Sequence, residues 1–236
     1  GPPRELRASM TQILIADDHP LFRLALTQAL RAIAPDATLI EADSLAAART
    51  QLDARHDIDL VLLDLHLPDS HGLMGLAELR AEHPAVAVVM ISANEDPAVI
   101  RRALAFGAAG YIPKGASLDE LAGALRAVLN CEEYVPPQLR NAIGATTTNS
   151  EDLKIAARLA SLTPQQFRVL SLVADGQLNK QIADKLGIQE RTIKAHLSLI
   201  FQKLGVRNRT QASVMLRSLE LGDPAKLVEL AGDGED

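Results

Sequence analysis

Short apolar runs and helical patterns alternate along the first half of the chain. Two of the runs, 60–63 and 86–91, are continuously apolar, which is typical of strands buried on both faces of a parallel sheet. The predicted strands lie at 12–16, 37–42, 60–64, 86–91 and 110–112. The predicted helices lie at 20–30, 45–54, 73–82, 97–106 and 118–129. Five strand–helix repeats predict an α/β fold with a flavodoxin-like parallel sheet and helices on both of its faces.

This alternation stops after residue 130. Residues 131–157, with Pro136-Pro137 and a Thr/Asn/Ser run, predict a linker that is part helical. Beyond Pro137 the helices are predicted at 151–160, 164–174, 180–186, 189–204 and 210–221. A short helix, Gly187 and a longer helix form the pattern of a helix-turn-helix. The predicted parts are an α/β domain at 10–130, the linker at 131–157, a small all-α domain at 158–222 and an acidic tail at 223–236.

Length and charge fit two domains with different partners. The chain has 236 residues, of which 47 % are hydrophobic, enough for two cores. A net charge of −6 by itself argues against nucleic acid. Residues 10–130, however, hold 9 Lys and Arg against 16 Asp and Glu, whereas residues 158–222 hold 10 against 4. The basic second module therefore points to DNA as its partner.

The cellular setting is also indicated by composition. A single cysteine, Cys131, leaves no internal disulfide and fits a cytoplasmic protein. No apolar stretch approaches the ~18–20 residues that cross a bilayer, so we expect no membrane partner.

Reactive side chains stand at the carboxyl ends of the predicted strands. They are Asp17 and Asp18 after the first strand, Asp64 after the third, Ser92 after the fourth and Lys114 after the fifth. The carboxyl ends of parallel strands share one edge, so these groups are expected to converge. Three adjacent carboxylates repel one another, and Mg²⁺ would neutralise them. With a lysine and a hydroxyl beside them, they predict a phosphoryl site in which an aspartate is the acceptor.

Residues 10–130 resemble the receiver domain of bacterial two-component response regulators. The matching stretches are 15–20 (IADDHP), 63–72 (LDLHLPDSHG), 90–93 (MISA) and 107–114 (GAAGYIPK). One departure is Gly115 after Lys114, where many receivers have a proline joined by a cis bond. A cis bond without proline would cost ~3 kcal/mol, so this bond is open to being trans.

The resemblance implies a role for each of the convergent residues. It makes Asp64 the phosphoacceptor for a sensor histidine kinase. It implies that Asp18 and Asp64 ligate Mg²⁺ directly, that the His66 carbonyl adds a ligand, and that Asp17 acts largely through water. Ser92 and Tyr111 would be the switch residues, the serine moving inward and the tyrosine reorienting on phosphorylation, and Lys114 would bind the phosphoryl group.

Residues 162–216 resemble the LuxR-type DNA-binding domain of the NarL/FixJ class. The matching stretches are LTP at 162, NKQIA at 179, LGI at 186, RTIKAHL at 191 and KLGVRNRTQA at 203. The exposed face of the longer helix carries Arg191, Thr192, Lys194, Ala195 and Ser198, and its N-terminal half would enter a major groove.

The same resemblance divides the DNA contacts into two kinds. Lys194, Ala195 and Ser198 would face bases, and the last helix would pair two copies into a homodimer. The phosphate contacts would be Thr192, Lys180, Lys203, Arg207 and Arg209. One departure is Gln165-Gln166, where the family usually has Arg-Glu, so the usual charged tether to the turn near Arg207 is lost.

We therefore predict a cytoplasmic, phosphorylation-dependent transcriptional regulator that is not an enzyme. Two alternatives remain open. One is a DNA-binding regulator with a silent receiver, whose DNA affinity would ignore phosphorylation. The other is an aspartate-dependent phosphatase. Such enzymes usually have a second acid two residues after the nucleophile, where this chain has His66.

Overall fold

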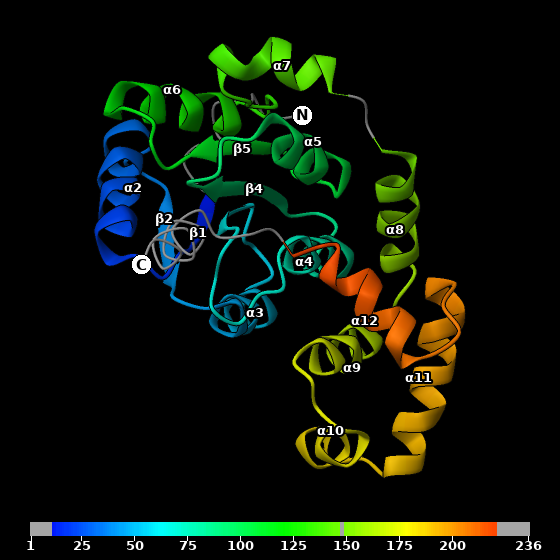
Figure 1. Ribbon diagram of the computed structural model, residues 1–236. Helices are drawn as coiled ribbons and strands as arrows, with labels where there is room; N and C mark the ends of the chain where they lie inside the picture. Colours follow the sequence, from blue (N-terminus) through cyan, green and yellow to red (C-terminus); the bar gives the residue numbers. More distant parts are fainter. Residues whose placement is uncertain (1–10, 147–148, 221–236) are drawn as a thin grey trace, which may run out of the picture.

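A five-stranded parallel sheet forms the first half of the chain. The computed structural model describes residues 11–146 and 149–220. The strands are β1 (Gln12–Ala16), β2 (Thr38–Ala42), β3 (Leu60–Asp64), β4 (Ala87–Ser92) and β5 (Gly110–Pro113). Their order in the sheet is β2-β1-β3-β4-β5, the flavodoxin-like order that the sequence predicts. Figure 1 shows β2 and β5 toward opposite edges of the sheet. All five residues of β3 are buried, as its continuous apolar run requires.

Helices cover both faces of the sheet. One face packs against α2 (Pro20–Ile33) and α6 (Leu118–Leu129), and these helices share a core with the inward residues of the strands. The other face packs against α3 (Leu45–Ala54), α4 (Leu73–Glu82) and α5 (Pro97–Ala105). The N-terminus of α6 has the predicted capping box between Ser117 and Glu120.

The segment after α6 is more ordered than its composition indicates. Tyr134 forms a parallel bridge with Gly110, and its carbonyl accepts a hydrogen bond from the Tyr111 N–H at 2.8 Å. A short 3₁₀ turn, η1 (Pro137–Leu139), and a helix not predicted from the sequence, α7 (Arg140–Ala145), follow. Ile143 of α7 is buried, which explains why this short helix forms where proline and small residues predict a loop.

Between residues 149 and 220 the regular elements are all helices. They are α8 (Ser150–Ala160), α9 (Pro164–Ala174), α10 (Asn179–Leu186), α11 (Glu190–Leu204) and α12 (Arg209–Arg217). The prediction that the last helix runs to 221 is wrong, because α12 ends at Arg217. Beyond it the chain turns, and the Leu219 carbonyl accepts a hydrogen bond from the Leu73 N–H at 3.0 Å. This contact with α4 takes the backbone out of the helical direction.

Some predictions fall outside this part of the chain. The predicted acidic tail, 223–236, lies outside the described residues. Among the helices that the structure does describe, none has the length and apolar character needed to cross a membrane. The Lys114–Gly115 bond is trans, as are the other peptide bonds between described residues.

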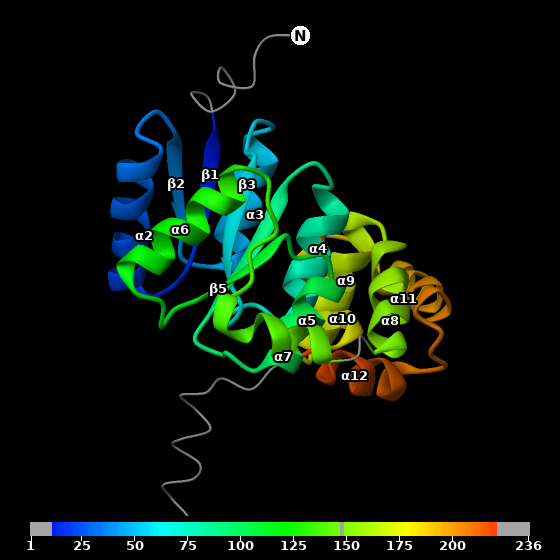
Figure 2. The same cartoon turned by 90° about the horizontal axis from the view of Figure 1, so that it is seen from above.

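The two halves are packed together. Helices α8 and α9 lie against α4, and α8 also contacts α5. Seen from above, α11 is on the side of the molecule away from the sheet, with α8 and α9 between them (Figure 2). The helix-turn-helix therefore presents α11 outward, and the sheet edge with the carboxylates lies elsewhere on the molecule.

Candidate functional site

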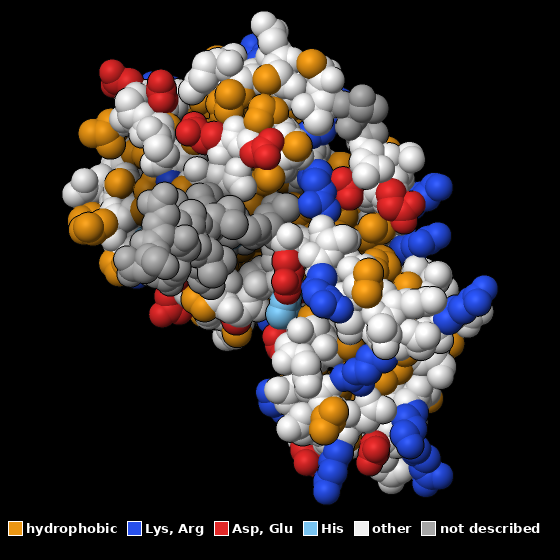
Figure 3. Space-filling view, in the orientation of Figure 1, with side chains coloured by type: hydrophobic (Ala, Val, Ile, Leu, Met, Phe, Trp, Pro, Cys, Tyr) orange, Lys and Arg blue, Asp and Glu red, His pale blue; other side chains and the backbone are white. Residues whose placement is uncertain are grey.

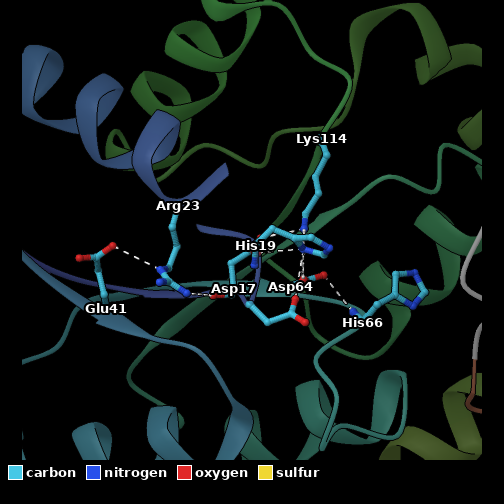
Figure 4. A network of polar contacts seen from close by, with 8 residues as sticks. Asp17, His19, Arg23, Glu41, Asp64, His66 and Lys114 are labelled. Atoms are coloured by element: carbon cyan, nitrogen blue, oxygen red, sulfur yellow. Dashed lines mark hydrogen bonds and ion pairs between the residues drawn. The ribbon is translucent and has the colours of Figure 1, made fainter. Parts of the chain in front are cut away.

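Three of the predicted carboxylates and the predicted lysine meet at the carboxyl edge of the sheet. Asp17 and Asp18 follow β1, Asp64 ends β3, and Lys114 follows β5. Lys114 Nζ lies 2.9 Å from Asp17 Oδ2 and 3.2 Å from Asp64 Oδ2 (Figure 4). Asp17 and Asp64 are almost fully buried, at 0 % and 1 % exposure, whereas Asp18 is partly exposed. One ammonium group thus faces two buried carboxylates.

The donor set of this pocket suits a hard divalent cation. Carboxylate oxygens of Asp17, Asp18 and Asp64 lie within 4.8 Å of one another. Asp17 Oδ2 and Asp18 Oδ1 are buried atoms that accept no hydrogen bond of normal geometry from the described residues, although Lys114 is close to the first. Buried oxygens of this kind are unfavourable unless a cation or water satisfies them. The residues present therefore fit Mg²⁺, which prefers oxygen ligands and keeps several waters.

Burial changes the protonation of the acceptor carboxyl. It raises the pKa of Asp64 above its usual range, against the lowering effects of the His66 N–H and of Lys114. The His66 N–H donates to Asp64 Oδ1 at 3.0 Å. Lys114 also stands 5.1 Å from the centre of the Phe22 ring, so its chain is held over an aromatic face.

The two predicted switch residues are both fully buried. Ser92 ends β4, and its hydroxyl accepts a hydrogen bond from the Asn94 N–H at 3.0 Å. The Tyr111 ring lies inside, and its hydroxyl donates to the Asn94 carbonyl at 2.6 Å. Burial raises the pKa of Tyr111 to about 12, so the phenol remains a donor at neutral pH. A single loop residue thus joins the serine and the tyrosine.

Two residues of this pocket were not singled out from the sequence. His19 Nδ1 lies 3.1 Å from both Asp17 Oδ1 and Asp18 Oδ1 and 2.8 Å from Lys114 Nζ. Arg23 donates to the Asp17 carbonyl at 2.6 Å and so fixes the end of β1. His19 directly follows the two aspartates in the chain, and that position is the signal that could have revealed it.

The predicted DNA-contacting residues gather on the outer side of the helical half. Lys and Arg side chains cluster over this region, toward the lower right in Figure 3. The side chains of Arg191, Lys194, Ala195 and Ser198 on α11 are exposed, and Thr192 is half-buried. Lys180, on α10, is also exposed. The opposite stripe of α11 is buried through Ile193, Leu197, Ile200 and Leu204.

The remaining predicted phosphate contacts differ in their surroundings. Arg207 is exposed, and Lys203 is half-buried. Arg209 is tied within the domain, because its guanidinium donates to Asn179 Oδ1 at 2.9 Å and to the Gln177 carbonyl. Arg209 therefore braces the loop before α10.

The Gln165-Gln166 departure has a structural counterpart. Gln166 is buried and caps α9 together with Thr163. Its Oε1 accepts from Lys203 Nζ at 2.8 Å, and the same Nζ donates to the Ser161 carbonyl at 3.1 Å. A neutral amide thus joins α9 to the end of α11 without an ion pair.

Known protein families match both the sheet half and the helical half of the chain. The response regulator receiver domain model matches residues 13–126, and the model of bacterial regulatory proteins of the luxR family matches residues 160–216. The chain is 41 % identical to the glycerol metabolism activator of Pseudomonas putida, over 86 % of this chain and 93 % of that protein. It is 32 % identical to the nitrate/nitrite response regulator NarL of Escherichia coli K12, over 86 % and 93 % of the two chains.

Solved structures agree with the fold. RcsB of Salmonella enterica serovar Typhimurium, bound to the promoter rprA with the phosphomimetic BeF₃⁻, matches with a TM-score of 0.53 and 25 % identity. That match covers 89 % of this chain and 99 % of the RcsB chain. The chain therefore belongs to the two-component response regulators that combine a receiver domain with a LuxR-type helix-turn-helix, a family of transcription regulators and not of enzymes.

Proposed function

We propose that Asp64 accepts a phosphoryl group from a sensor histidine kinase and that this controls DNA binding by the helical half. The observation that carries the proposal is the meeting of Asp17, Asp18, Asp64 and Lys114 in one partly buried pocket. The exposed basic face of α11 supplies the output. Since bacterial DNA lies in the cytoplasm, the proposal also assigns the protein to that compartment.

The proposed transfer needs an ionised Asp64. Its Oδ2 would attack the phosphorus atom, forming an O–P bond as the P–N bond to the kinase histidine breaks. Lys114 Nζ, 3.2 Å from that oxygen, would then bind a phosphoryl oxygen. Ser92 at the end of β4 would donate its hydroxyl to another.

The metal would be held by chain residues already in place. Asp18 and Asp64 would provide carboxylate oxygens directly and His66 its carbonyl, and Asp17 would act largely through water. When bound, Mg²⁺ would supply charge neutralisation for the carboxylates and the incoming phosphoryl oxygens. Release of Lys114 from Asp17 would leave this lysine free to follow the phosphoryl group.

For the output we propose that α11 lies in a major groove. Lys194, Ala195 and Ser198 would face the bases. The residues proposed to contact phosphates are Thr192, Lys180, Lys203, Arg207 and Arg209, and Arg191 is proposed to contact DNA from the same exposed face of α11. RcsB dimers have been solved on DNA, which supports binding as a homodimer. We propose that the two copies of this chain pair through α12.

The test is phosphate uptake from acetyl phosphate in Mg²⁺, measured by mass. The wild type is expected to gain one phosphoryl group, and Asp64→Asn none. Asp36→Asn, an exposed aspartate after α2, is the matched control and should label as the wild type does. Undiminished labelling of Asp64→Asn would contradict the assignment of Asp64 as the phosphoacceptor. A DNA affinity that does not change on phosphorylation would favour the alternative of a regulator with a silent receiver.

A further inference from the structure

The imidazole of His19 lies in the acidic pocket but has no part in the proposed phosphoryl transfer. Its Nδ1 atom is 3.1 Å from Asp17 Oδ1, 3.1 Å from Asp18 Oδ1 and 3.5 Å from Asp64 Oδ2. Figure 4 shows the ring directed toward Asp64 and Lys114. One nitrogen atom therefore lies beside all three carboxylates of the pocket.

The contact with Lys114 indicates that Nδ1 presents a lone pair to the pocket. Lys114 Nζ lies 2.8 Å from Nδ1, and an ammonium group can only donate a hydrogen bond. Nδ1 therefore accepts this bond, which places the ring proton on Nε2. The same lone pair faces the carboxylate oxygens of Asp17 and Asp18 at 3.1 Å. Lone pairs at such distances repel one another unless positive charge lies between them.

The Lys114 ammonium supplies positive charge at this point. Its Nζ is 2.9 Å from Asp17 Oδ2 and 3.2 Å from Asp64 Oδ2, in addition to its contact with His19. The pocket offers four possible ligand atoms, one nitrogen and three carboxylate oxygens, all within 4.8 Å of one another. Asp17 is fully buried, and its Oδ2 accepts no hydrogen bond of normal geometry. With a divalent cation among these atoms, that oxygen would be satisfied without the lysine.

The backbone around His19 holds the imidazole at the pocket. His19 is the N-cap residue of α2, and its N–H donates to Asp17 Oδ1 at 2.6 Å. Pro20 begins the helix and keeps the residue before it extended, with φ −96° and ψ 102°. The His19 side chain is 62 % exposed, so a cation can approach the ring from solvent.

The kind of donor atom decides which cations such a pocket prefers. Mg²⁺ is bound mainly through oxygen, whereas Co²⁺, Ni²⁺ and Zn²⁺ also bind imidazole nitrogen well. The three aspartates alone form an all-oxygen set. With the nitrogen of His19 the set becomes mixed, and a mixed set favours the transition cations.

We propose that His19 Nδ1 is a metal ligand and that it raises the preference of the acidic pocket for divalent transition cations over Mg²⁺. This inference rests on the proposed function, because it concerns the cation that accompanies phosphoryl transfer to Asp64. With Nδ1 bound to a cation, Lys114 loses its contact with the imidazole and is available to a phosphoryl oxygen.

The test compares binding of Co²⁺ and of Mg²⁺ by the full chain, measured by calorimetry for each ion separately. His19→Ala removes the nitrogen, and His19→Asn offers an amide oxygen in its place, and both variants keep the backbone N–H. His56→Ala, which removes an exposed histidine between α3 and β3, is the matched control. Every chain also carries His83→Ala, because Asp53, Glu82 and His83 form a second group with ligand atoms within 4.8 Å of one another.

The ratio of the Co²⁺ and Mg²⁺ association constants is expected to fall at least about tenfold in both His19 variants and to stay unchanged in His56→Ala. The visible absorption of bound Co²⁺ is expected to change in His19→Asn, where oxygen replaces nitrogen. A side chain that only shaped the pocket would change both constants by the same factor. That result, or a ratio equal to that of the control, would overturn the inference.

The phosphoryl labelling of Asp64 in Mg²⁺ is a separate measurement. A fall in the ratio without labelling of Asp64 would support the His19 ligand and contradict the proposed function. Normal labelling with an unchanged ratio would support the proposed function and contradict the His19 ligand. The two failures are therefore distinguishable.

Discussion

The buried side chain of Glu78 predicts how the stability of the protein depends on pH. It lies on α4 with 1 % exposure, and Arg49 of α3 donates to its Oε1 at 3.0 Å. Burial raises the pKa of Glu78 from 4.5 to about 7, although the positive charge of Arg49 acts in the opposite direction. The folded protein therefore holds a proton on Glu78 that the unfolded chain releases near pH 4.5.

The sign of the effect follows from this difference. The proton stabilises the folded state fully below the unfolded pKa, and that stabilisation is lost as pH rises through the folded pKa near 7. The size of the loss is roughly 3 kcal/mol between pH 4.5 and 8, from 1.36 kcal/mol per pH unit of pKa difference. In Glu78→Gln the side chain cannot ionise, so this part of the pH dependence disappears.

Urea unfolding between pH 5 and 8 measures this pH dependence of the free energy of unfolding. As pH rises, the free energy of unfolding of Glu78→Gln is expected to increase relative to that of the wild type. Some slope remains in the variant, because burial also raises the pKa of Asp64 and of Glu82. Glu95→Gln, an exposed glutamate, serves as control. Parallel stability curves for Glu78→Gln and wild type would refute the reasoning.

Other predictions concern the helical half. Lys194→Ala is expected to weaken DNA binding by about 1–3 kcal/mol and to alter sequence preference, and an unchanged footprint would count against α11 in the groove. Lys180→Ala should weaken binding to all sequences alike and lower the salt slope by about one, which titrations in increasing salt would show. Gln166→Ala removes a buried cap and should lower the free energy of unfolding by about 1–2 kcal/mol. The exposed Gln165→Ala is its control, and equal melting curves would contradict the role of the cap.

The fold was predictable because its signals are local. The continuous apolar run of β3 and the caps at Ser117 and Thr163 specify their elements without help from distant residues. The convergence of Asp17 and Asp64 followed from the topology, since parallel strands end at a common edge.

What the sequence did not reveal depends on contacts between distant segments. Helix α7 forms because Ile143 finds a buried position, and no local pattern indicates that position. The end of α12 is set by the Leu73 hydrogen bond to Leu219, across most of the chain. His19 lies beside Asp17 and Asp18, its neighbours in the chain, but its contact with Lys114 depends on the meeting of two distant strand ends.

The bridge between Tyr134 and β5 limits how far the helical half can travel. Helix α7 is held on the sheet domain through Ile143, and only four residues of sequence separate the end of α7 from the start of α8. Fully extended, such a connection spans about 15 Å. The two halves therefore meet at an effective concentration in the millimolar range or above, at which weak contacts suffice for closure. In a dimer whose DNA-binding modules are widely separated, the Tyr134 segment and α7 would have to leave β5 and α5. Their attachment to the sheet domain therefore limits the distance between the two halves.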